Sequence, residues 1–129
     1  MKPFIQQSAS FEDINQLVWQ HLEARDWHNN PPRGLATSIA LEAAELLEHY
    51  QWSDEAVGTT DDLASELADI FIYAFEFAQS QDIDIVAAIK HKLEIAAKKY
   101  PAENFKGQKP EDKRSAWLNA KLNYKKTGL

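Results

Sequence analysis

The chain has 129 residues, of which 44% are hydrophobic, so it has the length of one domain and enough apolar material for a core. It contains no cysteine, which excludes disulfides, thiolate metal sites and thiol nucleophiles. The net charge of −6 argues against a protein that follows a nucleic-acid backbone. The first residues lack the apolar core of a signal peptide, and no run approaches a membrane span. We expect a cytoplasmic protein without nucleic-acid or membrane partners.

Hydrophobic residues recur at helical spacing along the chain, and no stretch alternates as a strand does. Only 4 glycines and 5 prolines interrupt runs rich in Ala, Leu, Glu, Lys and Gln, which favour helix. We expect a loose arm at residues 1–9, helices at about 11–25, 35–50, 61–79 and 83–99, and a short last helix from Pro110. The predicted fold class is all-α, with a four-helix bundle core and a short extra C-terminal helix.

The third predicted helix, at about 61–79, is apolar nearly all the way round. Such a helix lies at the centre of a domain or in an oligomer interface. Its apolar surface is more than one copy of this small chain would cover. We therefore expect a single domain over residues 1–129, with 102–129 as a C-terminal extension, assembled as an oligomer.

Two pairs of acidic residues stand within the second and third predicted helices. Glu42 and Glu45 are three residues apart, as are Glu66 and Asp69, so each pair occupies one face of its helix. If the two helices pack antiparallel, the four carboxylates face each other and repel unless cations lie between them. Oxygen-only ligation suits Mg²⁺ first and Mn²⁺ next.

The alternative is that these four acids are surface charges on two amphipathic helices, and spacing alone leaves it open. A di-iron carboxylate site is disfavoured because it requires Glu-x-x-His pairs, and His49 follows Glu45 by four residues. An acidic cluster in an otherwise apolar bundle suggests a metal-dependent enzyme acting on a phosphoanhydride.

The acidic pairs and their surroundings resemble the MazG-like all-α nucleoside triphosphate pyrophosphohydrolases. The shared pattern is E-x-x-E, 20 residues, then E-x-x-D on adjacent helices. Within that family the chain is most similar to the dCTP pyrophosphatase branch, at RDW (25–27), PRGL (32–35), LEAAELLEHYQW, SELADIFIY and KKYP (98–101). The resemblance covers most of the chain.

The resemblance implies Mg²⁺-dependent hydrolysis of a (deoxy)nucleoside triphosphate, dCTP-like, to the monophosphate and pyrophosphate, as a house-cleaning activity on the nucleotide pool. It implies that Glu42, Glu45, Glu66 and Asp69 hold Mg²⁺, with Mn²⁺ as a substitute. Within this set, Glu45 is our candidate to orient or deprotonate the attacking water. The family also implies a homodimer or homotetramer whose pocket is assembled between subunits.

The substrate-binding residues implied by the resemblance lie around this acidic core; they are Trp27, His28, Trp52, Tyr73, Lys92 and Lys99. The two tryptophans are expected to sandwich the base, because a flat aromatic platform suits a nucleobase. The lysines would meet the phosphates, and Tyr73 would line the nucleoside. Taken without the family, the tryptophans and Tyr73 could equally serve packing, and the lysines could be solvated.

The chain departs from the family pattern in the loop before the second helix and on the fourth helix. The loop reads NNPPRGL, one residue short, with Gly34 in place of an Asn and the nearest histidine displaced to His28. Ala96 stands where the family tends to have an Asn. Two alternatives follow: a pyrophosphohydrolase for another nucleotide, or a catalytically weak nucleotide-binding or interaction protein of the same fold.

Overall fold

The computed structural model describes residues 9–128, and this part of the chain is helical with no strand. Its helices are α1 (Phe11–Glu23), α2 (Pro32–Glu48), α3 (Thr60–Ser80), α4 (Ile85–Lys99), the 3₁₀ turn η1 (Ala102–Asn104) and α5 (Pro110–Thr127). The all-α prediction is confirmed. The expected loose arm lies outside the described residues, apart from Ala9. No helix of the described chain is long and apolar enough to cross a membrane.

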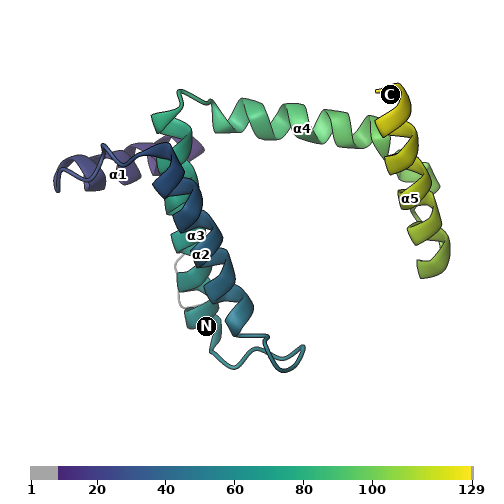
Figure 1. Ribbon diagram of the computed structural model, residues 1–129, viewed down its shortest axis with the longest axis horizontal. Helices are drawn as coiled ribbons and strands as arrows, with labels where there is room; N and C mark the ends of the chain where they lie inside the picture. The colour runs from purple at the N-terminus through teal and green to yellow at the C-terminus, as the bar shows by residue number, and fades with distance from the viewer. Residues whose placement is uncertain (1–8, 129) are drawn as a thin grey trace. The chain divides into compact units, whose positions relative to one another are not determined.

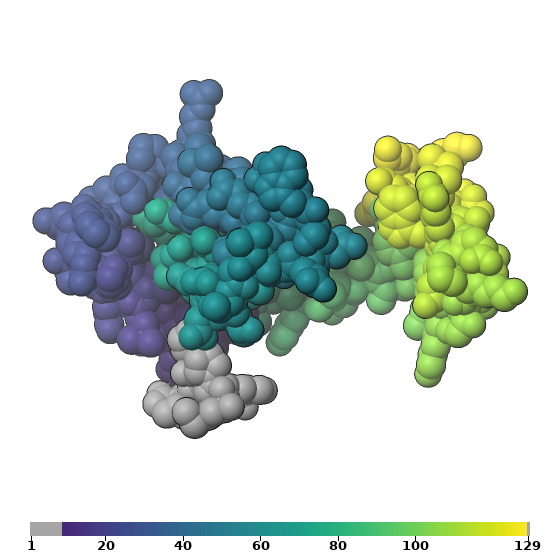
Figure 2. All heavy atoms as spheres, turned by 90° about the horizontal axis from the view of Figure 1, so that it is seen from below, coloured from purple at the N-terminus to yellow at the C-terminus, as the bar shows by residue number. Residues whose placement is uncertain are grey.

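The chain separates into two compact units, Met1–Ile85 and Val86–Leu129. The first unit holds α1, α2 and α3, which Figure 2 shows in purple to teal as one continuous mass of atoms. The second unit holds nearly all of α4 together with η1 and α5. The prediction of one domain over the whole chain stays a prediction.

Helices α1 and α3 begin and end in the same way. Each starts with a capping box: Ser10 with Asp13 in α1, and Thr59 with Asp62 in α3. α1 ends two residues earlier than expected because Asp26 adopts a left-handed φ of 53°. The amides of Asp26 and of the residue after it then donate to carbonyls of the last turn, which is a Schellman arrangement.

Helix α2 begins at Pro32, three residues earlier than the expected Leu35. Proline fits the first turn of a helix because the amide hydrogen it lacks has no partner there, and its φ is already helical. α2 and α3 then lie side by side and antiparallel across their short connection (Figure 1). The buried apolar side chains of this unit come from all three helices; they are Leu22, Leu35, Phe75 and Ala78.

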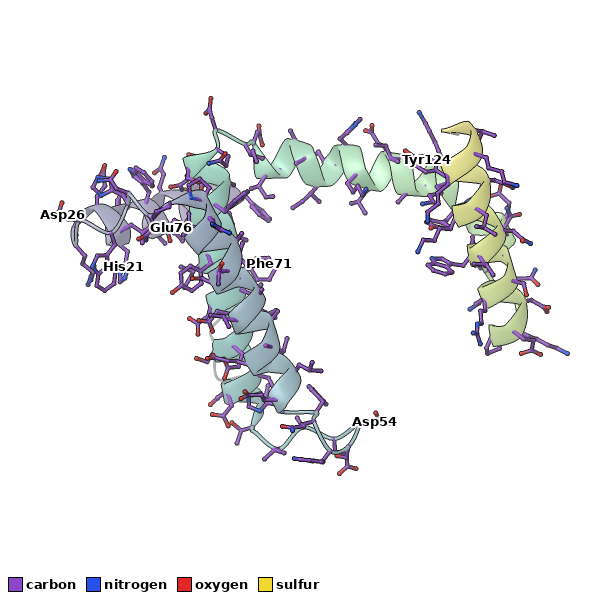
Figure 3. All side chains as sticks on the ribbon, viewed as in Figure 1. His21, Asp26, Asp54, Phe71, Glu76 and Tyr124 are labelled. Carbon is purple, nitrogen blue, oxygen red and sulfur yellow. The ribbon has the colours of Figure 1, made fainter. Side chains whose placement is uncertain are left out.

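The second unit is held by aromatic contacts at the end of α4. The rings of Tyr100 and Phe105 meet edge to face, with centroids 5.9 Å apart. Lys99 Nζ lies 4.5 Å from the ring centroid of Tyr124, which Figure 3 labels on α5. α5 has 18 residues and is longer than the short helix expected from the sequence. Its amphipathic stripe is weak, so the periodicity did not define its length.

Candidate metal and nucleotide site

Three carboxyl groups converge where α2 packs against α3. Glu42 and Glu45 on α2 and Glu66 on α3 each offer an oxygen, and these oxygens all lie within 4.8 Å of one another. We call these three residues the acidic cluster. Glu42 occupies the stripe of α2 that faces α3, and both Glu42 and Glu66 are half-buried, whereas Glu45 is exposed. The cluster is therefore open to solvent on the Glu45 side.

Glu42 is the carboxyl group of the acidic cluster whose charged form is disfavoured, because like charges lie close to it and it is partly buried. The pKa of Glu42 is raised to about 7, chiefly by a hydrogen bond with Glu45 and then by burial. The negative charges of Glu45, Asp69 and Glu66 contribute the rest of this increase. The same oxygens could bind a cation in place of the proton.

The donor set fits a hard divalent cation. All ligand atoms are carboxyl oxygens, which suit Mg²⁺ or Mn²⁺ rather than softer metals. Oε2 of Glu42 is buried and has no hydrogen-bond partner among residues 9–128, so an acceptor stands ready without a donor. Asp69 lies outside the 4.8 Å group, and its charge still acts on Glu42. The cluster thus has the chemistry and the unmet acceptor that a bound cation would satisfy.

A histidine supports the acidic cluster from the end of α2. His49 Nε2 lies 3.5 Å from Glu66 Oε1, and both side chains are mostly buried. Gly58 packs against the same ring: a Cβ there would lie 2.5 Å from two ring atoms of His49. From the sequence, the only role weighed for His49 is that of an iron ligand, which its spacing disfavours. Its spacing of seven from Glu42 and four from Glu45 was the signal that places it on the same face.

The two tryptophans proposed for the base lie in loops at either end of α2. Trp27 is 55% exposed, and Trp52, in the loop between α2 and α3, is 84% exposed. Both therefore have free ring surface. His28 is different: it is half-buried with its ring edge-on to Trp19 at 5.6 Å, and its Nδ1 is buried without a partner in the described chain.

The remaining predicted substrate residues divide between the two units. Tyr73 is half-buried on α3, one turn beyond Asp69 on the same side of the helix. Lys92 is exposed on α4. Lys99, also on α4, lies within cation–π distance of the rings of Tyr100 and Tyr124. Its ammonium group therefore already has aromatic partners within the second unit.

A buried carboxyl group that the sequence reasoning missed lies further along α3. Glu76 is 2% exposed, and its Oε1 accepts a hydrogen bond of 2.8 Å from Nδ2 of Asn30. Glu66, Asp69, Tyr73 and Glu76 follow one another at spacings of three, four and three, which puts all four on one stripe of α3. That continuation of the E-x-x-D pair was the signal available in the sequence.

Comparison with known proteins gives a consistent picture. The model of the MazG-like family matches residues 37–112, which include the whole acidic cluster. Bovine dCTP pyrophosphatase 1 is 31% identical over 107 residues, and the human protein of that name is 29% identical over 102 residues. The matches cover 76% and 72% of this chain but only 63% and 60% of those relatives, so the chain spans less than two thirds of their length.

A solved structure resembles the fold over a similar range. The crystal structure of a pyrophosphatase from Archaeoglobus fulgidus aligns with a TM-score of 0.61 and 28% identity, covering 76% of this chain and 99% of the other. Because the family model matches more than half of the chain, and the aligned structure agrees with it, the chain belongs to the MazG-like family.

Proposed function

We propose that this chain hydrolyses a nucleoside triphosphate, dCTP or a similar pyrimidine nucleotide, to the monophosphate and pyrophosphate. The observation that carries the proposal is the convergence of Glu42, Glu45 and Glu66 between α2 and α3. Membership of the MazG-like family supports it, as do the relatives named dCTP pyrophosphatase 1. Removal of such nucleotides from the cellular pool is the house-cleaning role we assign.

The metal would be Mg²⁺, with Mn²⁺ as a substitute, held by Glu42, Glu45, Glu66 and Asp69. When bound, such ions neutralise triphosphate charge and lower the pKa of a coordinated water. Glu45 is the exposed member of the acidic cluster, so a water can approach it from solvent. We assign Glu45 to orient an attacking water and to accept its proton as the water oxygen bonds to phosphorus and the link between the α and β phosphates breaks, releasing pyrophosphate.

The substrate would lie along the stripe of α3 that carries the acidic cluster. Tyr73 is one turn beyond Asp69, where it would line the nucleoside. Trp27 and Trp52 retain exposed rings on which a base can stack. His28 is assigned to the same pocket because it follows Trp27 directly, although its ring is turned to α1. Lys92 and Lys99 are assigned to the phosphates, as cations on α4.

We further propose that the working form is a homodimer or homotetramer. Large apolar side chains of α3 stay exposed in the single chain: Leu67 at 47% and Phe71 at 51%. On the neighbouring helix, Leu41 and Leu47 are exposed at 60% and 68%. Apolar surface of this extent on two packed helices is typical of a subunit interface.

A second candidate is the same reaction on another nucleotide, and the loop between α1 and α2 favours it. Gly34 has no side chain to offer a base, and a Cβ there would meet nothing within 4 Å beyond its chain neighbours and its own helix backbone. His28 is turned against Trp19 instead of being free for a base. Ala96 on α4, where the family tends to have an Asn, favours instead a catalytically weak nucleotide-binding or interaction protein of the same fold.

A panel of nucleotides tests the proposal. The purified chain is incubated with each NTP and dNTP in Mg²⁺ or Mn²⁺, and pyrophosphate and orthophosphate are quantified separately. We expect pyrophosphate, fastest with dCTP or a modified dCTP, and its loss in Glu45→Gln. Glu48→Gln, an exposed neighbour on α2, is the matched control and should retain activity. If the chain binds nucleotides but hydrolyses none of them, the proposed activity is refuted and the chain is a nucleotide-binding protein.

A further inference from the structure

The most buried charged residue of the described chain has no role in the chemistry proposed above. Glu76 is 2% exposed and lies on α3 between Phe75 and Ala78, which both belong to the core. Burying a carboxyl group is costly unless it is hydrogen-bonded. The hydrogen-bond partner of Glu76 therefore indicates which contact its burial serves. That partner is Asn30, a residue 46 positions earlier and in an exposed part of the loop between α1 and α2.

Asn30 joins two groups with one amide. Its Nδ2 donates to Glu76 Oε1 at 2.8 Å and also to the backbone carbonyl of Trp27 at 2.9 Å. Both hydrogens of the amide are used. Trp27 has a second backbone hydrogen bond: its N–H donates to the carbonyl of Leu22 at the end of α1, at 2.9 Å. The backbone of Trp27 is therefore held by α1 from one side and, through Asn30, by α3 from the other.

Glu76 belongs to the same stripe of α3 as the acidic groups. It follows Asp69 by seven residues and Tyr73 by three, so it lies about 10 Å further along the helix axis than Asp69. Figure 3 labels Glu76 on the side of α3 where α1 and the loop lie, with Asp26 marking the loop. One rigid helix thus carries the acidic cluster's Glu66 at one level and the anchor of the Trp27 loop at another.

We infer that Glu76 is a positioning residue: through Asn30, it fixes Trp27 at a set distance from the acidic cluster and so sets where the base of a bound nucleotide can stack. The inference rests on the proposed function for the identity of the ligand. The anchor itself rests on the burial of Glu76 and the two hydrogen bonds of Asn30.

Two substitutions separate the anchor from simple packing. Asn30→Asp removes both donors and sets a second carboxyl group against Glu76. Glu76→Gln keeps the side-chain shape and an oxygen that can still accept from Asn30. In the double variant, the new amide at 76 can donate to the new carboxyl at 30, which restores their link with donor and acceptor exchanged. Asn29→Asp is the matched control, since its amide is exposed and, among residues 9–128, lies at hydrogen-bond distance from its neighbour His28 at 3.4 Å, not from α3.

The first measurement is hydrogen–deuterium exchange of residues 24–31 in the full chain without nucleotide. A hydrogen bond to a charged group is worth enough that its loss should speed this exchange about tenfold or more in Asn30→Asp. Asn29→Asp and Glu76→Gln should stay within about twofold of wild type, and the double variant should recover part of the loss. The inference is overturned if residues 24–31 exchange at the same rate in Asn30→Asp as in the wild type. It is also overturned if the double variant exchanges as fast as Asn30→Asp.

The second measurement is the split between KM and kcat with the preferred nucleotide. If Trp27 is displaced, the base that stacks on its ring binds more weakly. KM should therefore rise about tenfold in Asn30→Asp, and kcat should stay within about twofold of the wild-type value. A fall in kcat at unchanged KM would contradict a role in placing the base. If the wild-type chain releases no pyrophosphate from any nucleotide, the proposed function fails, whereas the exchange result still decides whether Glu76 anchors the loop.

Discussion

Glu42 offers the sharpest test of the acidic cluster, because protons and cations compete for it. Its pKa is raised to about 7, first by the hydrogen bond with Glu45 and then by burial and the surrounding negative charges. A cation that binds the deprotonated form must displace that proton. Metal affinity should therefore rise with pH across the neutral range, and Glu42→Gln should remove that dependence.

The magnitude follows from the pKa. A group with a pKa near 7 is about one tenth deprotonated at pH 6 and about nine tenths at pH 8, so the apparent Mn²⁺ affinity should rise about tenfold between them. Calorimetric titration with Mn²⁺, in buffers of different ionisation enthalpy, measures the affinity and the protons released. An affinity independent of pH, or no proton release at pH 7, would refute the reasoning.

The raised pKa of Glu42 should also make the stability of the metal-free chain depend on pH. Metal affinity should rise with pH, whereas this stability should fall. The folded pKa of Glu42 lies above its ordinary value of 4.5, so the native chain binds more protons than the unfolded one between about pH 4.5 and 7. The stability from this group is fully present below pH 4.5 and is lost as pH rises through about 7. We expect the Tm to fall over that range, less so in Glu42→Gln, and to be restored by Mg²⁺ at pH 8.

Three further changes probe the fold and the pocket. Gly58→Ala should lower the free energy of unfolding in urea by about 1–3 kcal/mol, because the new Cβ would lie 2.5 Å from the His49 ring. Adding His49→Ala to this variant should relieve most of the loss. If the losses of the two single variants simply add in the double variant, this contact is contradicted. Thr59→Ala should cost about 1 kcal/mol by removing the cap of α3, whereas Thr60→Ala, one residue inside the helix, should cost less. Trp52→Ala should leave the Tm unchanged, because the ring is 84% exposed, and should raise KM by about fivefold or more if a base stacks on it; an unchanged KM would remove Trp52 from the pocket.

Much of the first unit could be predicted from its sequence because local signals and the fold agree there. The apolar periodicity predicted this helix at about 61–79, within one residue of the observed bounds of α3, Thr60–Ser80. The paired spacing of Glu42 and Glu45, with Glu66 on the next helix, predicted that these carboxyl groups would meet if the two helices packed antiparallel, and their oxygens do lie within 4.8 Å of one another. A short connection and two amphipathic faces leave few other arrangements.

What the sequence did not reveal depends on contacts between distant residues. Asn30 lies 46 positions from Glu76, and nothing local in either segment points to their hydrogen bond. The turn at Asp26 was missed because a left-handed aspartate carries no fixed local signature, unlike a glycine at that position. The spacing of His49 put it on the face of Glu42 and Glu45, but its contact with Glu66, on the other helix, could not be read from that spacing.

The central claim is that the acidic cluster serves cleavage of a triphosphate between its α and β phosphorus atoms. The most direct measurement is ³¹P NMR of dCTP incubated with Mg²⁺ and either the wild-type chain or Glu45→Gln. We expect dCMP and pyrophosphate as the only products of the wild type, and turnover at least about a hundredfold slower in Glu45→Gln. Formation of dCDP and orthophosphate, or equal rates in the two proteins, would contradict it.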